Sequence, residues 1–96
     1  MGPRFTWDDD KAAANQHKHA VSFEEAQTVF DNPLAVIFDD EAHSDAEPRE
    51  IIVGHSARNR LLLVCFTERA NSIRIISARR ATAKERNDYE ERTGFW

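Results

Sequence analysis

Arginine side chains are the groups in this sequence best suited to binding an anion. The second half, residues 49–96, carries ten basic side chains, nine of them arginine, against six acidic ones. Arginine presents a rigid, planar fork of N–H donors that matches the oxygens of a phosphate or a carboxylate. We expect a phosphate-binding set at a face or rim of a sheet, drawn from Arg58, Arg60, Arg74, Arg79 and Arg80.

The alternation of side chains along a strand limits how many of these arginines can act together. In a regular strand over residues 73–79, Arg74 and Arg79 point to opposite faces. Only a β-bulge between them would bring both onto one face. The alternative to a binding site is a solvated surface on which the arginines form salt bridges with Glu50 and Glu68.

Groups that could transfer a proton lie at the end of the first predicted helix and in the last one. Lys18 and His19 are adjacent, and a cation at a helix C-terminus is also favourable for structural reasons alone. Glu85 and Tyr89 are four residues apart, so they share a helix face that could pack near Arg79. Tyr89 could handle protons or stack on RNA, although a packing role is commoner.

Covalent, metal and nucleotide-cofactor chemistry find little support in the sequence. Cys65 lies within an apolar run and is expected to be inert core, and no serine has a Gly-x-Ser-x-Gly context. The three glycines build no phosphate-binding loop. His17 and His19 point in different directions on a helix, and no Cys pair is present. We therefore expect no metal and no cofactor.

A chain of 96 residues is enough for one domain, which we place over residues 1–96. Residues 1–48 carry three basic and eleven acidic side chains, a net charge of −8, whereas the second half has a net charge of +4. The longest apolar run has six residues, far below the roughly 20 of a membrane helix. One cysteine fits a reducing cytoplasm.

Helix and strand signals predict the order β-α-α-β-β-β-β-α. The predicted strands cover about residues 5–7, 34–38, 51–55, 61–67 and 72–79, and the predicted helices residues 11–19, 23–30 and 83–93. Asp8 to Asp10 provide an N-cap and first-turn acids, and Gly94 provides a C-terminal stop. Capping boxes are expected at Ser22 with Glu25 and at Thr82 with Glu85.

These elements indicate an α+β domain. We expect a small antiparallel β-sheet, a meander of hairpin-linked strands, with the two N-terminal helices packed on it and one C-terminal helix. The apolar strand 61–67 should be central and covered on both faces. The last helix mixes both charges, which disfavours a direct DNA binder.

An ordered set of short motifs resembles the BrnT toxin family. The first part reads Phe5-x-Trp7-Asp8-x-x-Lys11, then Asn15-x-x-Lys18-His19-x-Val21-Ser22-Phe23-Glu24-Glu25-Ala26, then Val29-Phe30. The later part reads Arg74-Ile75-Ile76-Ser77-Ala78-Arg79, followed by Glu85 and Tyr89. Each piece is short, but the ordered set is specific and covers about residues 4–93. One departure is Ala20, at a position that is commonly glycine in this family.

The resemblance implies a RelE-like fold and the toxin of a type II toxin–antitoxin system. Such a protein would be a cytoplasmic, metal-independent endoribonuclease that cleaves RNA, free or on the ribosome, inhibits translation and arrests growth. Its partner would be an antitoxin with a ribbon-helix-helix region, through which the complex would bind operator DNA. No cofactor and no membrane would be involved.

The same resemblance suggests roles for individual residues. Arg79 ends the later motif and is the first choice for binding phosphate and stabilising the transition state. The predicted catalytic set is completed by Arg60, Lys18, His19 and Tyr89. The predicted RNA-binding set is Arg58, Arg74, Arg80 and Glu85.

Two further readings stay open at the level of sequence. The chain could be a non-catalytic interaction module whose arginines and sheet edge bind a partner helix. The aromatic pair Phe95-Trp96 could serve as a docking spot.

Overall fold

The computed structural model describes residues 4–43 and 47–94, so Phe95 and Trp96 lie outside the described residues. The helices are α1 (Asp9–His19), α2 (Phe23–Thr28) and α3 (Ala83–Thr93), with short 3₁₀ turns η1 (Val29–Asp31) and η2 (Glu41–His43). The strands are β1 (Arg4–Thr6), β2 (Val36–Asp39), β3 (Glu50–His55), β4 (Leu61–Arg69) and β5 (Ser72–Arg80).

The five strands form one mixed sheet in the order β1-β5-β4-β3-β2. Strands β2 to β5 pair antiparallel in sequence order, as the short hairpins predict. The expectation of a purely antiparallel sheet is wrong at one edge, because β1 pairs parallel to β5. The order of the elements was predicted, but the pairing of β1, the first strand of the chain, with β5, the last one, was not.

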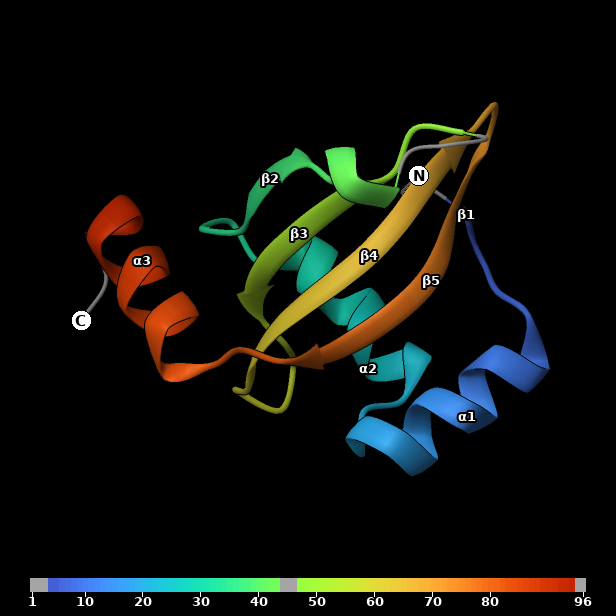
Figure 1. The fold of residues 1–96 in the computed structure, drawn as a ribbon, viewed down its shortest axis with the longest axis horizontal. Coiled ribbons are helices and arrows are strands. Elements are labelled where there is room, and N and C mark those ends of the chain that lie inside the picture. The colour runs from blue at the N-terminus through green and yellow to red at the C-terminus, as the bar shows by residue number, and fades with distance from the viewer. Residues whose placement is uncertain (1–3, 44–46, 95–96) are drawn as a thin grey trace.

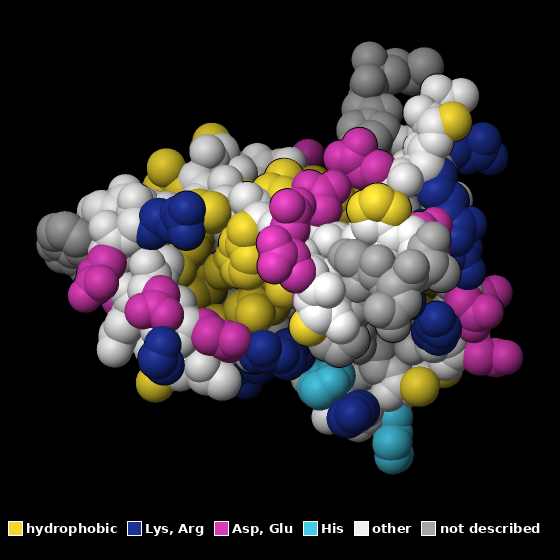
Figure 2. Space-filling view, turned by 45° about the horizontal axis from the view of Figure 1, so that its top comes forward, with side chains coloured by type: hydrophobic (Ala, Val, Ile, Leu, Met, Phe, Trp, Pro, Cys, Tyr) yellow, Lys and Arg dark blue, Asp and Glu magenta, His cyan; other side chains and the backbone are white. Residues whose placement is uncertain are grey.

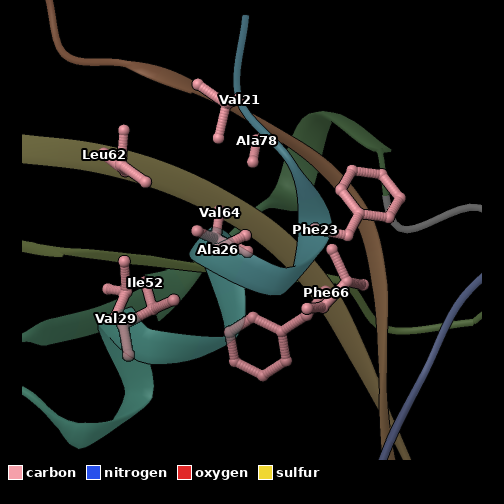
Figure 3. Packing of buried hydrophobic residues seen from close by; sticks show 10 residues of the cluster. Val21, Phe23, Ala26, Val29, Ile52, Leu62, Val64, Phe66 and Ala78 are labelled. Atoms are coloured by element: carbon pink, nitrogen blue, oxygen red, sulfur yellow. The ribbon is translucent and has the colours of Figure 1, made fainter. Parts of the chain in front are cut away.

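Helices cover both faces of the sheet, and the two N-terminal helices share one face (Figure 1). On that face, β4 contributes Leu62, Val64 and Phe66 to a core with Phe23 and Ala26 of α2 (Figure 3). On the other face, Leu61 and Leu63 of β4 pack with Tyr89 of α3. The prediction that this strand is central and covered on both faces is therefore confirmed for most of its length.

A bulge in β5 decides which side chains reach each face. Cys65 is paired with Ser77 and the next residue, Phe66, with Ile75, so Ile76 is an extra residue in β5. Ile75 and Ala78 consequently both lie in the helix-covered core. Arg74 pairs with Thr67 of β4, and Arg79 pairs with Leu63. Thr67 and Leu63 lie an even number of residues apart on β4, so their side chains and those of their partners point to the same face. The bulge therefore places both arginines on the face that α3 partly covers.

The predicted helix caps form, with one exception. The side chain of Asp8 accepts a hydrogen bond from Lys11 N–H, and Thr82 and Glu85 make a complete capping box. Gly94 ends α3 in the left-handed conformation. At α2 only half of the expected box exists, because Ser22 caps the helix whereas the Glu25 carboxylate is bound elsewhere.

The Glu25 carboxylate instead ties α2 to the turn between β3 and β4. It accepts hydrogen bonds from the Ser56 hydroxyl at 2.7 Å and from Arg60 Nε at 2.9 Å, and a second Arg60 nitrogen pairs with it as well. That arginine also donates to the carbonyl of Ala20 at 3.1 Å. The arginine hydrogen bonds lower the pKa of Glu25 although its burial opposes this.

The residue that Arg60 contacts at the end of α1 has an unusual backbone. Ala20 is left-handed, with φ 56° and ψ 34°, which explains why glycine suits this position. Alanine there costs on the order of 1 kcal/mol. The Arg60 contact helps to hold the chain in this conformation between α1 and α2.

Arg60→Ala is expected to lower the free energy of unfolding by about 3 kcal/mol, because it leaves the buried Glu25 carboxylate without its main partner. Urea unfolding measures this loss. Arg58→Ala is the matched control, since Arg58 lies 3.8 Å from the same carboxylate but its side chain is 72% exposed. Its cost should stay below about 1 kcal/mol, and equal losses in the two variants would contradict the assignment.

Candidate active site

Arg79, near the end of β5, is the charged group around which the candidate site is built. Its two terminal nitrogens donate to the two carboxylate oxygens of Glu85, each at 2.8 Å. Hydrogen bonds from Arg79, aided by those from Thr82, lower the pKa of Glu85 to about 2 against the effect of burial. The same pair raises the pKa of Arg79, and 41% of the arginine side chain stays exposed.

Two cavities meet at Arg79. The first, of about 340 Å³, lies between the sheet and α3 and is lined by Val36, Phe38, Ile51, Val53, Leu63, Arg79, Glu85, Asp88, Tyr89 and Arg92. The second, of about 450 Å³, lies on the side of α1 and is lined by Lys18, His19, Asp40, Ile51, Leu63, Cys65, Ser77, Ala78 and Arg79. Because Ile51, Leu63 and Arg79 line both, the two cavities adjoin, and we call them together the groove. Figure 2 shows hydrophobic side chains exposed in the hollow beside α3.

The second cavity brings together the strongest candidates from the sequence. Lys18 and His19 come from the C-terminus of α1 and reach the same cavity as Arg79, about 60 residues later in the chain. The groove therefore holds a fixed guanidinium, an amine and an imidazole, the groups needed to bind a phosphate and to move protons.

Sequence reasoning missed part of this cavity. Cys65 was expected to be core, but it is only half-buried and lines the cavity beside Ser77, its partner in the sheet. The apolar neighbours of Cys65 concealed this, because alternation along β4 places Cys65 on the same face as Leu61 and Leu63, a face that α3 covers only in part. Asp40, buried at the end of β2, was missed as well, and its place depends on tertiary packing.

The remaining predicted arginines occupy other places. Arg74 lies on the same sheet face as Arg79. Arg80, exposed, pairs with Leu62, whose side chain belongs to the core on the opposite face. Arg58 and Arg60 line neither cavity, and Arg60 is held by Glu25.

Tyr89 anchors α3 to the sheet. Its side chain is buried, its hydroxyl donates to the carbonyl of Leu34 at 3.0 Å, and its ring meets His55 edge to face at 5.7 Å. Burial raises the pKa of Tyr89 and lowers that of His55. The ring lines the first cavity, with the hydroxyl committed to a backbone partner.

Two broader features of the described residues bear on the class of protein. Over residues 4–43 and 47–94, no three or more His, Cys, Asp or Glu side chains gather in a way that could hold a metal ion. Within the same residues no helix is long and apolar enough to cross a membrane.

The fold and groove define a small α+β protein with an arginine-lined groove on the sheet face that α3 partly covers. Residues 7–85 match the family described as the ribonuclease toxin, BrnT, of type II toxin–antitoxin systems. The chain therefore belongs to the BrnT family of ribonuclease toxins, and the resemblance noted in its motifs is confirmed.

A solved structure agrees with this fold. The 1.1 Å crystal structure of the Brucella abortus ribonuclease toxin BrnT is similar with a TM-score of 0.65 and 21% sequence identity. The match covers 84% of this chain and 99% of that one. The α+β architecture expected from the sequence is thereby confirmed. No curated protein matches the sequence.

Glu85→Gln should remove one pH-dependent part of the stability. Because the folded-state pKa of Glu85 is lowered to about 2, its contribution is present above its ordinary pKa of 4.5 and is lost as the pH falls toward 2. Glutamine can still close the capping box. We expect the variant to be less stable than the unmodified chain by about 1 kcal/mol at pH 7, since both partners are partly exposed. Urea unfolding from pH 7 to pH 2 should show the gap closing, and a gap independent of pH would refute the pair's role.

Tyr89→Phe separates an anchoring role from proton transfer. Loss of the hydrogen bond to Leu34 should cost about 1 kcal/mol of stability. Cleavage of RNA by the folded variant should change less than threefold, because the hydroxyl is committed to the backbone. A 100-fold or greater loss of activity with unchanged stability would instead make Tyr89 an acid–base group.

Proposed function

We propose that this BrnT-family toxin is a metal-independent endoribonuclease that binds the scissile phosphate of RNA at Arg79. The observation that carries the proposal is the convergence of Lys18, His19 and Arg79 on one cavity from elements far apart in the chain. Arg74 lies on the same sheet face as Arg79, earlier in β5 and outside both cavities, where it adds positive charge to that face.

The proposed reaction uses the ribose 2′-hydroxyl of the substrate as nucleophile. His19 accepts the hydroxyl proton, since an imidazole can take and return protons near neutral pH. A bond forms between the 2′-oxygen and phosphorus while the bond to the 5′-oxygen breaks, and Lys18 supplies a proton to that leaving oxygen. Arg79 offsets the charge that develops on the phosphate oxygens. The products are a 2′,3′-cyclic phosphate end and a 5′-hydroxyl end.

The ion pair with Glu85 prepares Arg79 for this role. The carboxylate occupies the two N–H donors that a phosphate would need and holds the guanidinium at the shared part of the groove. A phosphodiester presents two oxygens with a similar spacing and the same single negative charge, so it can replace Glu85 on part of the fork. Glu85 thus keeps the arginine oriented when no RNA is bound.

In the cell, we propose that this cleavage occurs in the cytoplasm, inhibits translation and arrests growth until an antitoxin neutralises the toxin. A ribbon-helix-helix antitoxin is the proposed partner, and operator DNA would be reached only through it. Membership of a type II toxin–antitoxin family supports an antitoxin partner.

Arg79→Ala should reduce RNA cleavage 100- to 1000-fold, because it removes the donor facing the phosphate. Purified chains incubated with an RNA oligonucleotide in excess EDTA give the rate, and analysis of the product ends gives the mechanism. Arg58→Ala is the control, since Arg58 is exposed and lines neither cavity.

The expected ends are cyclic or 3′-phosphates. Products with 3′-hydroxyl ends would overturn the proposed chemistry, and full activity of a folded Arg79→Ala variant would overturn the proposed site. Expressed alone, the unmodified chain should arrest growth whereas the variant should not.

A further inference from the structure

The end of the groove beneath α3 differs chemically from the end near Lys18 and His19. Its floor is apolar, formed by Phe38, Val53 and Leu63 among others, and Tyr89 closes it from α3. At about 340 Å³ it is large enough to receive one or two side chains of another molecule. The hydrogen-bond donors that line it are Arg79, which is paired with Glu85, Tyr89, whose hydroxyl is bound to the carbonyl of Leu34, and Arg92.

The apolar surface continues outward along β2, the last strand on its side of the sheet. Among the described residues, the large hydrophobic side chains that remain exposed are Leu34 at 46%, Ile37 at 51% and Phe38 at 41%. All three lie on or just before this strand. Phe38 lines the groove, whereas Ile37 pairs with Ile52, which belongs to the core on the opposite face.

Acidic side chains border this apolar end. Glu85 and Asp88 line it from α3, and Asp39 and Glu41 are exposed just beyond Phe38. Glu85 is paired with Arg79 and Asp88 with Lys84, and Arg92 lines this end as well, so the four carboxylates outnumber these three cations by one. Figure 2 shows acidic side chains beside the hydrophobic hollow. This small excess of negative charge favours a segment that carries lysine or arginine over a polyanion.

We propose that the apolar groove beneath α3 docks a segment of the antitoxin that carries an apolar anchor flanked by basic side chains. The family supplies an antitoxin as partner, and the apolar floor with its net acidic border suits such a segment better than a polyanion. Because Ile51, Leu63 and Arg79 line both ends of the groove, a segment docked here crowds the proposed RNA site. This last consequence, the exclusion of RNA, rests on the proposed ribonuclease site, whereas docking itself does not.

Two neighbouring substitutions test the apolar part. Phe38→Ala should weaken binding of the purified cognate antitoxin at least tenfold, because it removes the exposed ring that lines the groove. Ile37→Ala is the matched control on the same strand, with a similarly exposed side chain on the other face, and should change the affinity less than threefold. Both side chains are exposed, so both variants should fold, as circular dichroism would verify.

A second pair tests the charge. Asp88→Lys should weaken antitoxin binding at least tenfold and make the remaining affinity less sensitive to salt. Glu91→Lys makes the same charge change on α3 at an exposed residue that does not line the groove, and should have a smaller effect.

The proposal is overturned if Phe38→Ala and Ile37→Ala bind the antitoxin alike. It is also overturned if Phe38→Ala leaves antitoxin binding intact and reduces RNA cleavage, because RNA would then be the occupant of the groove. Antitoxin affinity is measured directly, for instance by calorimetry, so failure of the ribonuclease proposal would appear separately as absence of RNA cleavage by the unmodified chain.

Discussion

The extra residue Ile76 in β5 is the constraint on which the functional face depends. It lets Ile75 and Ala78 both enter the core beneath α1 and α2, although they are three residues apart. The same shift turns Arg74 and Arg79 to the other face. Without it, either an arginine would be buried among apolar side chains or the core would lose a contact. Packing of the core and assembly of the groove are therefore consequences of one irregularity.

Two arginine–glutamate pairs show how burial separates structure from function. The pair of Arg60 with Glu25 is enclosed, with side chains 19% and 5% exposed, and it ties α2 to the turn after β3 and to the end of α1. The pair of Arg79 with Glu85 is more open, at 41% and 31%, and stands where two cavities meet. A ligand can reach Arg79 and Glu85 from the groove. To separate Arg60 from Glu25, a ligand would have to open the fold. The enclosed pair thus serves stability, whereas the open pair leaves its arginine accessible for the proposed binding of RNA.

Local signals in the sequence predicted most of the secondary structure, because caps, turns and hydrophobic periodicity act over a few residues. Asp8, Thr82 and Gly94 mark helix ends correctly, and the apolar β4 is central. The parallel pairing of β1 escaped prediction since it joins residues nearly 70 positions apart. The partner of Glu25 was not predicted for the same reason, because Arg60 lies 35 residues further along the chain. The Glu25 carboxylate could close the local capping box or pair with Arg60, and in the structure it forms the buried ion pair with Arg60.

The central claim is that RNA occupies the cavity shared by Lys18, His19 and Arg79. Cys65, the single cysteine, lines that cavity and is partly exposed, so its alkylation by a maleimide reports on occupancy. An RNA oligonucleotide with 2′-O-methyl groups can bind but lacks the nucleophile, and it should slow alkylation of Cys65 at least fivefold at saturation. Arg79→Ala should require much more RNA for the same protection. An unchanged alkylation rate at RNA concentrations that saturate binding would contradict the account.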